Sequence, residues 1–296
     1  MSVTFANAIR AVQAEILTAN ADSRLVGEMV GSHGGVAGTC AGLLEEFGAD
    51  RVLELPVADR GTLALAVGMA LGGRTIIVEL SSTGRLPAVF EVLADAGAIA
   101  RRGDFRLNLV VRVPYGQNAA GLDHPVGQNI HRIPGLDVLC PADAGQAAGL
   151  LRHALRSGRP TVFLEPRALY TSRGILPAEA VAPAPRTLRS GSHITLAAWG
   201  TGVGAALAAA EILLASGIDA EVIDLVALTG SADDPLTASV VRTGRLVVVH
   251  PEDAVLADAI RQIGLDGAFL HLESPLASAR DNADTVVSAA RSSVQY

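Results

Sequence analysis

Glu28, Asp59 and Ser81 each follow a short apolar stretch of this sequence, and His124 lies in the polar loop GLDHPVGQN that comes after another. A carboxylate at the edge of apolar surroundings loses hydration, which shifts its pKa and suits it to proton transfer. An imidazole titrates near neutrality and can serve as a general acid or base. The alternative interpretation is that these are ordinary loop side chains, so the elements around them decide which interpretation holds.

Asp59 has the most unusual surroundings, within the segment LELPVADRGTLALAVGMALGG at 53–73. The Ala/Gly/Leu run after it has almost no polar face, which predicts a helix buried on all sides. At its start, Asp59 is either an N-cap that accepts backbone amide hydrogens or a partly desolvated catalytic carboxylate. The local pattern alone leaves both interpretations open.

Strand and helix patterns alternate along the whole chain, which predicts an α/β fold with mostly parallel sheets sandwiched by helices. We expect two domains, residues 1–170 and 193–296, joined by a proline-rich linker at 171–192. Ligands bind such sheets at the carboxyl ends of the strands. The polar residues named above are therefore expected to converge on one rim.

Composition excludes several classes of function. Half of the 296 residues are hydrophobic, the formal net charge is −7, and every basic residue is Arg. We therefore expect no nucleic-acid or anionic-membrane partner. Cys40 and Cys140 follow no metal-binding spacing and indicate a reducing compartment. No secretory signal pattern and no apolar run of membrane-spanning length occur, so a soluble cytoplasmic protein is expected.

One glycine motif offers a nicotinamide-dependent dehydrogenase as an alternative function. Gly200, Gly202 and Gly204 lie between a predicted strand and helix, and Asp224 ends the next predicted strand. This is a degenerate form of the dinucleotide-binding pattern. The same glycines also serve tight turns and close packing in parallel sheets, so the motif by itself leaves both interpretations open.

A series of segments resembles the β-subunits of thiamine-diphosphate-dependent 2-oxo-acid dehydrogenases, which belong to the wider transketolase group. In the first half these are VGEMVGSHGGVAGTCAGLLEEFGADRVLELPVADRGTLALAVGMALGG, LVVRVPYG, HRIPGLDVLCPADA and RPTVFLEPRALY. In the second half they are ITLAAWGTGV, AEVIDLVALT and TGRLVVVHPED. Their order and spacing match over about residues 4–255.

The resemblance implies a pyrimidine-binding domain followed by a transketolase-type C-terminal domain. It also implies an α-subunit partner, which holds the diphosphate and a Mg²⁺ ion with a G-D-G…N motif that this chain lacks. In the family a glutamate at the position of Asp59 hydrogen-bonds the aminopyrimidine ring. Glu28 matches a glutamate near the cofactor, and His124 falls near the family's active-site histidine. The expected assembly is an α₂β₂ heterotetramer.

The chain departs from this pattern at the cofactor. Asp59 replaces a glutamate, which withdraws the carboxylate by about 1.5 Å. Ser81 and Gly84 stand where the family stacks aromatic rings on the pyrimidine. The C-terminal tail, which helps to dock the acyltransferase core in dehydrogenase complexes, is short.

The sequence is compatible with three functions. The first is a β-like subunit that forms and transfers an activated aldehyde from a 2-oxo acid or ketose. The second is a non-catalytic structural or regulatory subunit. The third is a nicotinamide-dependent dehydrogenase.

Overall fold

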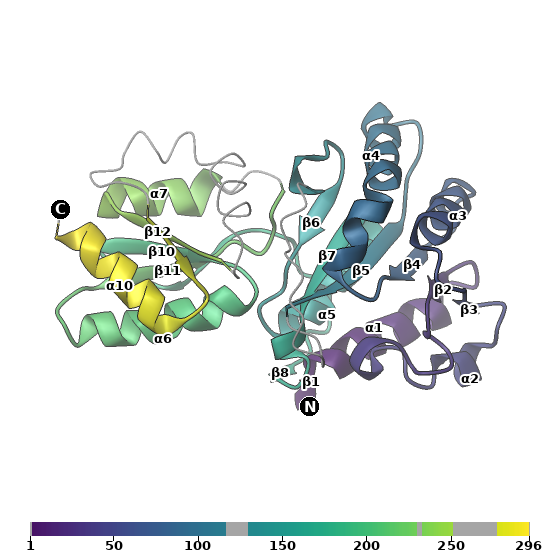
Figure 1. Ribbon diagram of the computed structural model, residues 1–296, viewed down its shortest axis with the longest axis horizontal. Helices are drawn as coiled ribbons and strands as arrows, with labels where there is room; N and C mark the ends of the chain where they lie inside the picture. Colours follow the sequence, from purple (N-terminus) through teal and green to yellow (C-terminus); the bar gives the residue numbers. More distant parts are fainter. Residues whose placement is uncertain (1, 117–129, 230–232, 251–276, 296) are drawn as a thin grey trace. The chain divides into compact units, whose positions relative to one another are not determined.

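The structure, a computed structural model, describes residues 2–116, 130–229, 233–250 and 277–295. The chain divides into two compact units, Met1–Ala182 and Pro183–Tyr296. Each unit is built on its own β-sheet (Figure 1). This division falls inside the segment 171–192 that the sequence marks as a linker.

Unit 1 contains a six-stranded parallel sheet in the order β3-β2-β4-β5-β7-β6. Its strands alternate with helices along the chain, which places the carboxyl ends of all six strands at one edge. The strands are β2 (Arg24–Gly27), β3 (Val52–Glu54), β4 (Ile76–Glu79), β5 (Leu109–Tyr115), β6 (Asp137–Leu139) and β7 (Thr161–Pro166).

The helices of unit 1 form two layers, one on each side of this sheet. Figure 1 shows α1 below the strands, while α3 and α4 lie above them. The helices are α1 (Phe5–Ala19), α2 (Leu43–Phe47), α3 (Asp59–Leu71), α4 (Leu86–Arg102) and α5 (Ala144–Ser157), with short 3₁₀ turns η1 (Val36–Gly38), η2 (Thr83–Arg85), η3 (Ile130–Arg132) and η4 (Arg167–Leu169). Asp143 caps α5 by accepting from the Gln146 amide, as its sequence pattern predicts.

Helix α3 differs from its prediction, because it is not buried on all sides in this chain. Leu63, Ala66 and Ala70 face the core, whereas Leu65 is 48 % exposed and Leu71 is 37 % exposed. Gly61, Ala64 and Gly68 are also exposed, so the outer face of α3 is apolar and free of charge beyond its first turn. The sequence pattern identified an apolar helix correctly but could not show that one face lies at the surface.

The described residues of unit 2 form a five-stranded mixed sheet in the order β13-β12-β10-β11-β9, in which β9 is antiparallel to its neighbour and the other pairs are parallel. Helices α6 and α10 pack together, and α7 packs against β10. The elements are β9 (Arg186–Arg189), β10 (Ile194–Ala198), α6 (Thr201–Leu214), β11 (Ala220–Asp224), α7 (Asp233–Thr243), β12 (Leu246–His250), β13 (Ala277–Arg280) and α10 (Ala283–Val294).

The α/β fold class predicted from the sequence is confirmed, but several small elements were missed. Strand β8 (Arg173–Ile175) pairs with β1 (Ser2–Thr4), and β9 pairs with β11. The segment 171–192 is therefore not an unstructured linker throughout, because strands lie near both of its ends. These edge strands are three or four residues long and carry no alternating pattern. Strand β13 and helix α10 were also missed. The sequence pattern instead predicts a helix at 255–263 and a strand at 268–272, and both segments lie outside the described residues.

Candidate functional site

Glu28 and Asp59 meet at the carboxyl ends of neighbouring strands. Glu28 directly follows β2, and Asp59 opens α3 after the connection from β3. Because β2 lies between β3 and β4 in the sheet, their side chains are close enough for the two charges to interact. For these two acids, the shared rim that the sequence predicts follows from this parallel strand order.

Asp59 is not an N-cap, so the simpler of its two interpretations is wrong. Ala58 occupies the cap position and no side chain caps this helix end, while Asp59 is the first helical residue. Its carboxylate is only 9 % exposed, and its Oδ2 accepts from Nη1 of Arg85 at 3.2 Å. Among the residues that the structure describes, no contact to Oδ1 of Asp59 is found. One carboxylate oxygen is therefore held and the other is left for a further donor.

Glu28 is the second acid at this edge of the sheet. Its Oε1 is buried and accepts no hydrogen bond in the described part of the chain. Burial raises the pKa of Glu28, the negative charge of Asp59 raises it further, and Arg85 lowers it. A glutamate with a raised pKa therefore lies near a second acid, an arrangement that is typical of acid–base sites.

The positions matched to the aromatic platform lie just after β4, in the turn that leads to α4. Ser81 is half-buried, and its carbonyl oxygen accepts from Nη2 of Arg167 at 2.6 Å. Gly84 is exposed within η2. Neither residue can stack on a ring, whereas the neighbouring Arg85 reaches Asp59. His124 lies outside the described residues.

These residues fit the polar edge of an aminopyrimidine better than its flat face. The free Oδ1 of Asp59 is an acceptor for a ring nitrogen or amino group, and the buried Oε1 of Glu28 lacks a partner. Ser81 and Gly84 provide no aromatic surface. The hydrogen-bonding groups at this edge therefore fit the polar edge of such a ring, whereas Ser81 and Gly84 offer it no stacking platform.

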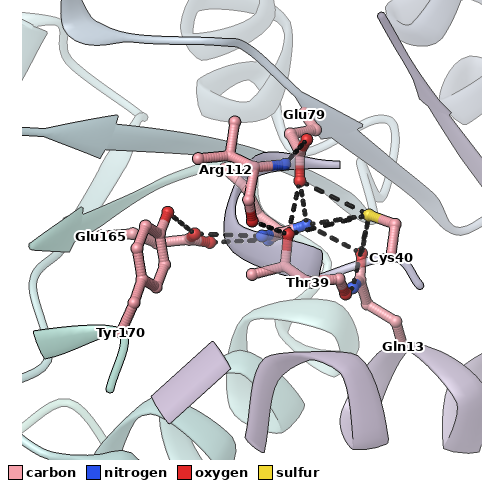
Figure 2. Close-up of polar contacts among 8 residues, drawn as sticks. Gln13, Thr39, Cys40, Glu79, Arg112, Glu165 and Tyr170 are labelled. Carbon is pink, nitrogen blue, oxygen red and sulfur yellow. Dashed lines mark hydrogen bonds and ion pairs between the residues drawn. The ribbon is translucent and has the colours of Figure 1, made fainter. Parts of the chain in front are cut away.

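A second cluster of charged residues lies inside unit 1 and is centred on Arg112 of β5 (Figure 2). The guanidinium is fully buried and lies between two carboxylates, donating to Glu79 at 2.8 Å and to Glu165 at 2.6 Å. Nη1 of Arg112 also donates to Gln13 of α1 at 3.0 Å, and Tyr170 donates to Glu165 at 2.8 Å. The network joins three strands, a helix and a loop.

The pKa shifts in this network follow from burial and from the shared cation. Burial by itself would lower the pKa of Arg112, but Glu165 and Glu79 outweigh it and hold that pKa well above its usual value. Burial raises the pKa of Glu165 in spite of Arg112. Burial and the nearby Glu79 raise the pKa of Cys40 to about 12, which leaves its thiol protonated and unreactive.

The network also fixes the Gly-rich loop between β2 and α2. Glu79 accepts from the Val36 amide and from the Thr39 hydroxyl, both at 2.8 Å. On the outer side, Glu54 accepts from the Gly31 amide and from Ser32, whose hydrogen bonds lower the pKa of Glu54. Met29 lies within this anchored segment with a φ of 54°, a strained value for a side chain other than Gly. The loop next to Glu28 is thus held in one conformation.

Neither Arg85 nor the Arg112 network was predicted from the sequence, although a signal for the network was present. Glu79, Arg112 and Glu165 each interrupt an apolar strand, in IIVEL, LVVRV and VFLEP. Charges in strands that are buried on both faces need partners, so three such residues in neighbouring strands indicate a buried ion-pair network. Arg85 had no comparable signal, because an arginine in a polar turn is ordinary.

The glycine motif of unit 2 is explained by packing. Gly202 lies against β12, and a Cβ added there would meet the Val249 carbonyl oxygen at 3.0 Å. Asp224 is fully buried, and it pairs with Arg186 at 3.2 Å and accepts from the Val226 amide at 3.0 Å. A buried, already engaged carboxylate does not fit a ribose hydroxyl, so the nicotinamide interpretation loses its acidic residue.

Two further findings describe the chain's surface and chemistry. No helix among the described residues is long and apolar enough to cross a membrane. Within the same part of the chain, no group of three or more His, Cys, Asp or Glu side chains is arranged to hold a metal ion.

Comparison with family models places both units in one class of protein. Residues 1–173 match the pyrimidine-binding domain of transketolase, and residues 185–292 match the transketolase C-terminal domain. A solved structure described as an inactive β4 tetramer of a split-gene transketolase superposes with a TM-score of 0.82, covering 99 % of this chain and 98 % of that chain. At 18 % sequence identity this likeness shows the fold alone.

Curated relatives are similar over most of the chain. The β-subunit of the pyruvate dehydrogenase E1 component from Leifsonia xyli subsp. xyli is 32 % identical over 93 % of this chain and 85 % of its own length. The corresponding subunit from Staphylococcus epidermidis is 34 % identical over 93 % of this chain and 88 % of its length. The mitochondrial subunit from Saccharomyces cerevisiae is 32 % identical over 93 % of this chain and 80 % of its length. The chain therefore belongs to the transketolase-type β-subunit family of thiamine-diphosphate-dependent enzymes, which confirms the resemblance seen in the sequence.

Proposed function

We propose that this chain supplies the pyrimidine-side half of a thiamine diphosphate site that activates a small 2-oxo acid or a ketose. The observation that carries the proposal is the pair of interacting acids at the sheet edge, in which Oδ1 of Asp59 and the buried Oε1 of Glu28 both lack a hydrogen-bond partner among the described residues. Pyruvate is the first donor to test, because the curated relatives are named as subunits of pyruvate dehydrogenase.

The residues of this chain act by binding, orienting and holding protons. Asp59 accepts a hydrogen bond from the pyrimidine ring through Oδ1 while Arg85 holds Oδ2. Glu28, whose pKa is raised by burial and by Asp59, holds a proton more readily than an exposed glutamate and lies next to the ring as a proton donor. When bound, thiamine diphosphate supplies the nucleophilic carbon and the electron sink for cleavage beside a carbonyl group. His124 remains a proposed acid–base residue on the substrate side.

The partner is an α-like subunit of the same heteromeric enzyme. We assign to it the G-D-G…N motif, the diphosphate and the Mg²⁺ ion, and we expect an α₂β₂ heterotetramer in the cytoplasm. The exposed apolar face of α3 supports the proposal of a large interface, because contiguous apolar surface of this kind marks protein contacts. The acceptor is either lipoamide or a free small molecule.

A non-catalytic structural or regulatory subunit is the second candidate function. It is favoured by the three departures at the site: the shorter carboxylate of Asp59, its ion pair with Arg85, and the small residues Ser81 and Gly84. In this case the chain binds its partner and completes the assembly, but it does not support turnover.

The experiment is co-purification of the tagged full-length chain with its α-like partner, followed by calorimetry with thiamine diphosphate and Mg²⁺. A heteromeric complex that binds the cofactor and turns over pyruvate or another 2-oxo acid supports the proposal. A complex that forms but does not bind or turn over points to the structural subunit. A well-folded chain that associates with no α-like partner contradicts both the catalytic and the structural role.

A further inference from the structure

Arg85 is the one charged group that contacts the carboxylate of Asp59 in the described structure. Its Nη1 lies 3.2 Å from Oδ2, in a pair where Asp59 is 9 % exposed and Arg85 is 40 % exposed. The contact uses a single oxygen, so the guanidinium fixes the rotation of the carboxylate without covering Oδ1. An arginine that only blocked the site would be expected to engage both oxygens in the bidentate geometry that guanidinium groups favour.

The backbone that carries Arg85 is anchored on both sides. Before it, β4 ends at Glu79 in the buried network, and the Leu80 amide donates to the Arg112 carbonyl at 3.0 Å. After it, Leu86 and Val89 of α4 are fully buried. The guanidinium therefore extends from a fixed point, which a group that orients another side chain requires.

The short side chain of Asp59 explains why a fixed guanidinium would matter here. An aspartate ends about 1.5 Å closer to the backbone than the glutamate that the family resemblance implies at this position. With no aromatic platform at Ser81 and Gly84, the ring has fewer contacts that set its position. A carboxylate that is short and free to rotate would hold a hydrogen bond to the ring poorly.

We propose that Arg85 is the positioning residue for Asp59, holding Oδ2 so that Oδ1 is presented to the pyrimidine ring of the cofactor. The inference rests on the proposed function, because it concerns the same site. Arg85 acts through Asp59 and does not touch the reacting atoms. Its presence compensates for the aspartate, so its importance depends on the length of the carboxylate side chain.

A double-mutant cycle in the co-purified complex tests this dependence. Arg85→Gln is compared with the parent in two backgrounds, the natural Asp59 and the variant Asp59→Glu. With Asp59, we expect kcat to fall about 100-fold, since a displacement of about 1 Å in a catalytic group costs that much. The affinity for thiamine diphosphate, measured by calorimetry, should fall about tenfold, which corresponds to about 1.4 kcal/mol. In the Asp59→Glu background both effects should be below about threefold, because the longer side chain does not need the support.

The matched control is Arg60→Gln, which removes an exposed arginine that pairs α3 with Glu91 of α4 at 2.7 Å but does not contact Asp59. It should leave kcat and cofactor affinity unchanged. Equal losses for Arg85→Gln in both backgrounds, no loss, or a gain in affinity would each overturn the inference. A gain would instead show that Arg85 blocks the ring. If the wild-type complex neither binds the cofactor nor turns over, the proposed function fails and the inference fails with it, whereas an active wild type with a silent Arg85→Gln contradicts the inference alone.

Discussion

The acids at the edge of the first sheet differ in their surroundings from the acids that are buried with Arg112. Glu79 and Glu165 share the buried cation Arg112, whereas Glu28 has a buried oxygen without any partner among the described residues. Arrangements of the first kind are structural, and an unsatisfied acid beside a second acid is a feature of functional sites. The structure separates the two roles although all three residues are glutamates at the ends of strands.

The raised pKa of Glu28 makes stability depend on pH. The folded chain keeps this proton to higher pH than the unfolded chain, so between the ordinary value of 4.5 and the raised pKa of Glu28 the free energy of unfolding falls as pH rises. Glu28→Gln removes the ionisable carboxyl and with it this loss of stability at higher pH. We expect wild type and variant to melt at the same temperature near pH 4, and the variant to melt higher near pH 8. Glu91→Gln, an exposed site, controls for loss of a charge, and a constant difference for Glu28→Gln across pH would contradict the account.

The buried position of Arg112 predicts a large loss of stability when it is replaced. Arg112→Met leaves two buried carboxylates without their cation, which costs about 3–5 kcal/mol. Arg10→Met removes a partly exposed pair with Glu46 and should cost at most about 1 kcal/mol. Urea denaturation of the isolated chain measures both. Losses of similar size for the two variants would show that the network does not stabilise the fold.

Residue patterns could place Asp59, Glu28 and Ser81 on one rim, because the rim follows from parallel strand order. They could not identify Arg85 as the partner of Asp59. That contact depends on how the turn after β4 folds toward α3, and no periodicity in the sequence encodes it. The choice between an N-cap and a free carboxylate also required backbone geometry at Ala58.

At the scale of elements, the long helices and central strands were predictable, because burial imposes strong periodicity on them. The edge strands β1, β8 and β9 are short and are paired by neighbours that are distant or non-local in the sequence. Their pattern is therefore weak. The exposed face of α3 was not predicted for a different reason. An apolar helix has the same sequence pattern whether its outer face is covered by other parts of the same chain or by a partner subunit.

Helix α3 predicts how assembly depends on one exposed side chain. Leu65→Arg places a charge on the apolar outer face, where it should prevent association with the α-like partner. The isolated variant should keep its stability within about 0.5 kcal/mol, because the side chain is at the surface. Phe105→Arg, at a residue that is 54 % exposed outside α3, is the control. If the Leu65→Arg variant still co-purified with the partner, α3 would not be part of the interface.

Two glycines of α6 differ in how much room each has for a larger side chain. Gly204→Ala meets nothing within 4 Å and should stabilise the helix by about 0.5–1 kcal/mol. Gly202→Ala should lose that gain, because its Cβ meets the Val249 carbonyl oxygen at 3.0 Å. Thermal unfolding compares the two variants, and wild type should show no binding of NAD or NADP. Micromolar dinucleotide affinity, abolished by Gly202→Val, would restore the nicotinamide interpretation.

At the scale of the whole molecule, the chain consists of two units of the transketolase type and belongs to a family of enzyme subunits. In the proposed function this chain supplies the acids at the pyrimidine, and the α-like partner holds the diphosphate and Mg²⁺. Activity therefore belongs to the complex, and each test of catalysis must be made there. The class of enzyme was predictable from the resemblance, whereas the substrate was not, because no residue pattern in this chain distinguishes one 2-oxo acid or ketose from another.

The most direct test of the central claim is Asp59→Asn in the co-purified complex. The variant keeps the shape of the side chain and removes its charge, and a lost transition-state contact of this kind costs about 2.7–4 kcal/mol, or about 10²–10³ in rate. We expect steady-state turnover to fall by that factor while the melting temperature changes little, because the pair with the half-exposed Arg85 contributes at most about 1 kcal/mol. Turnover equal to that of the wild type would contradict the assignment of Asp59 to the cofactor.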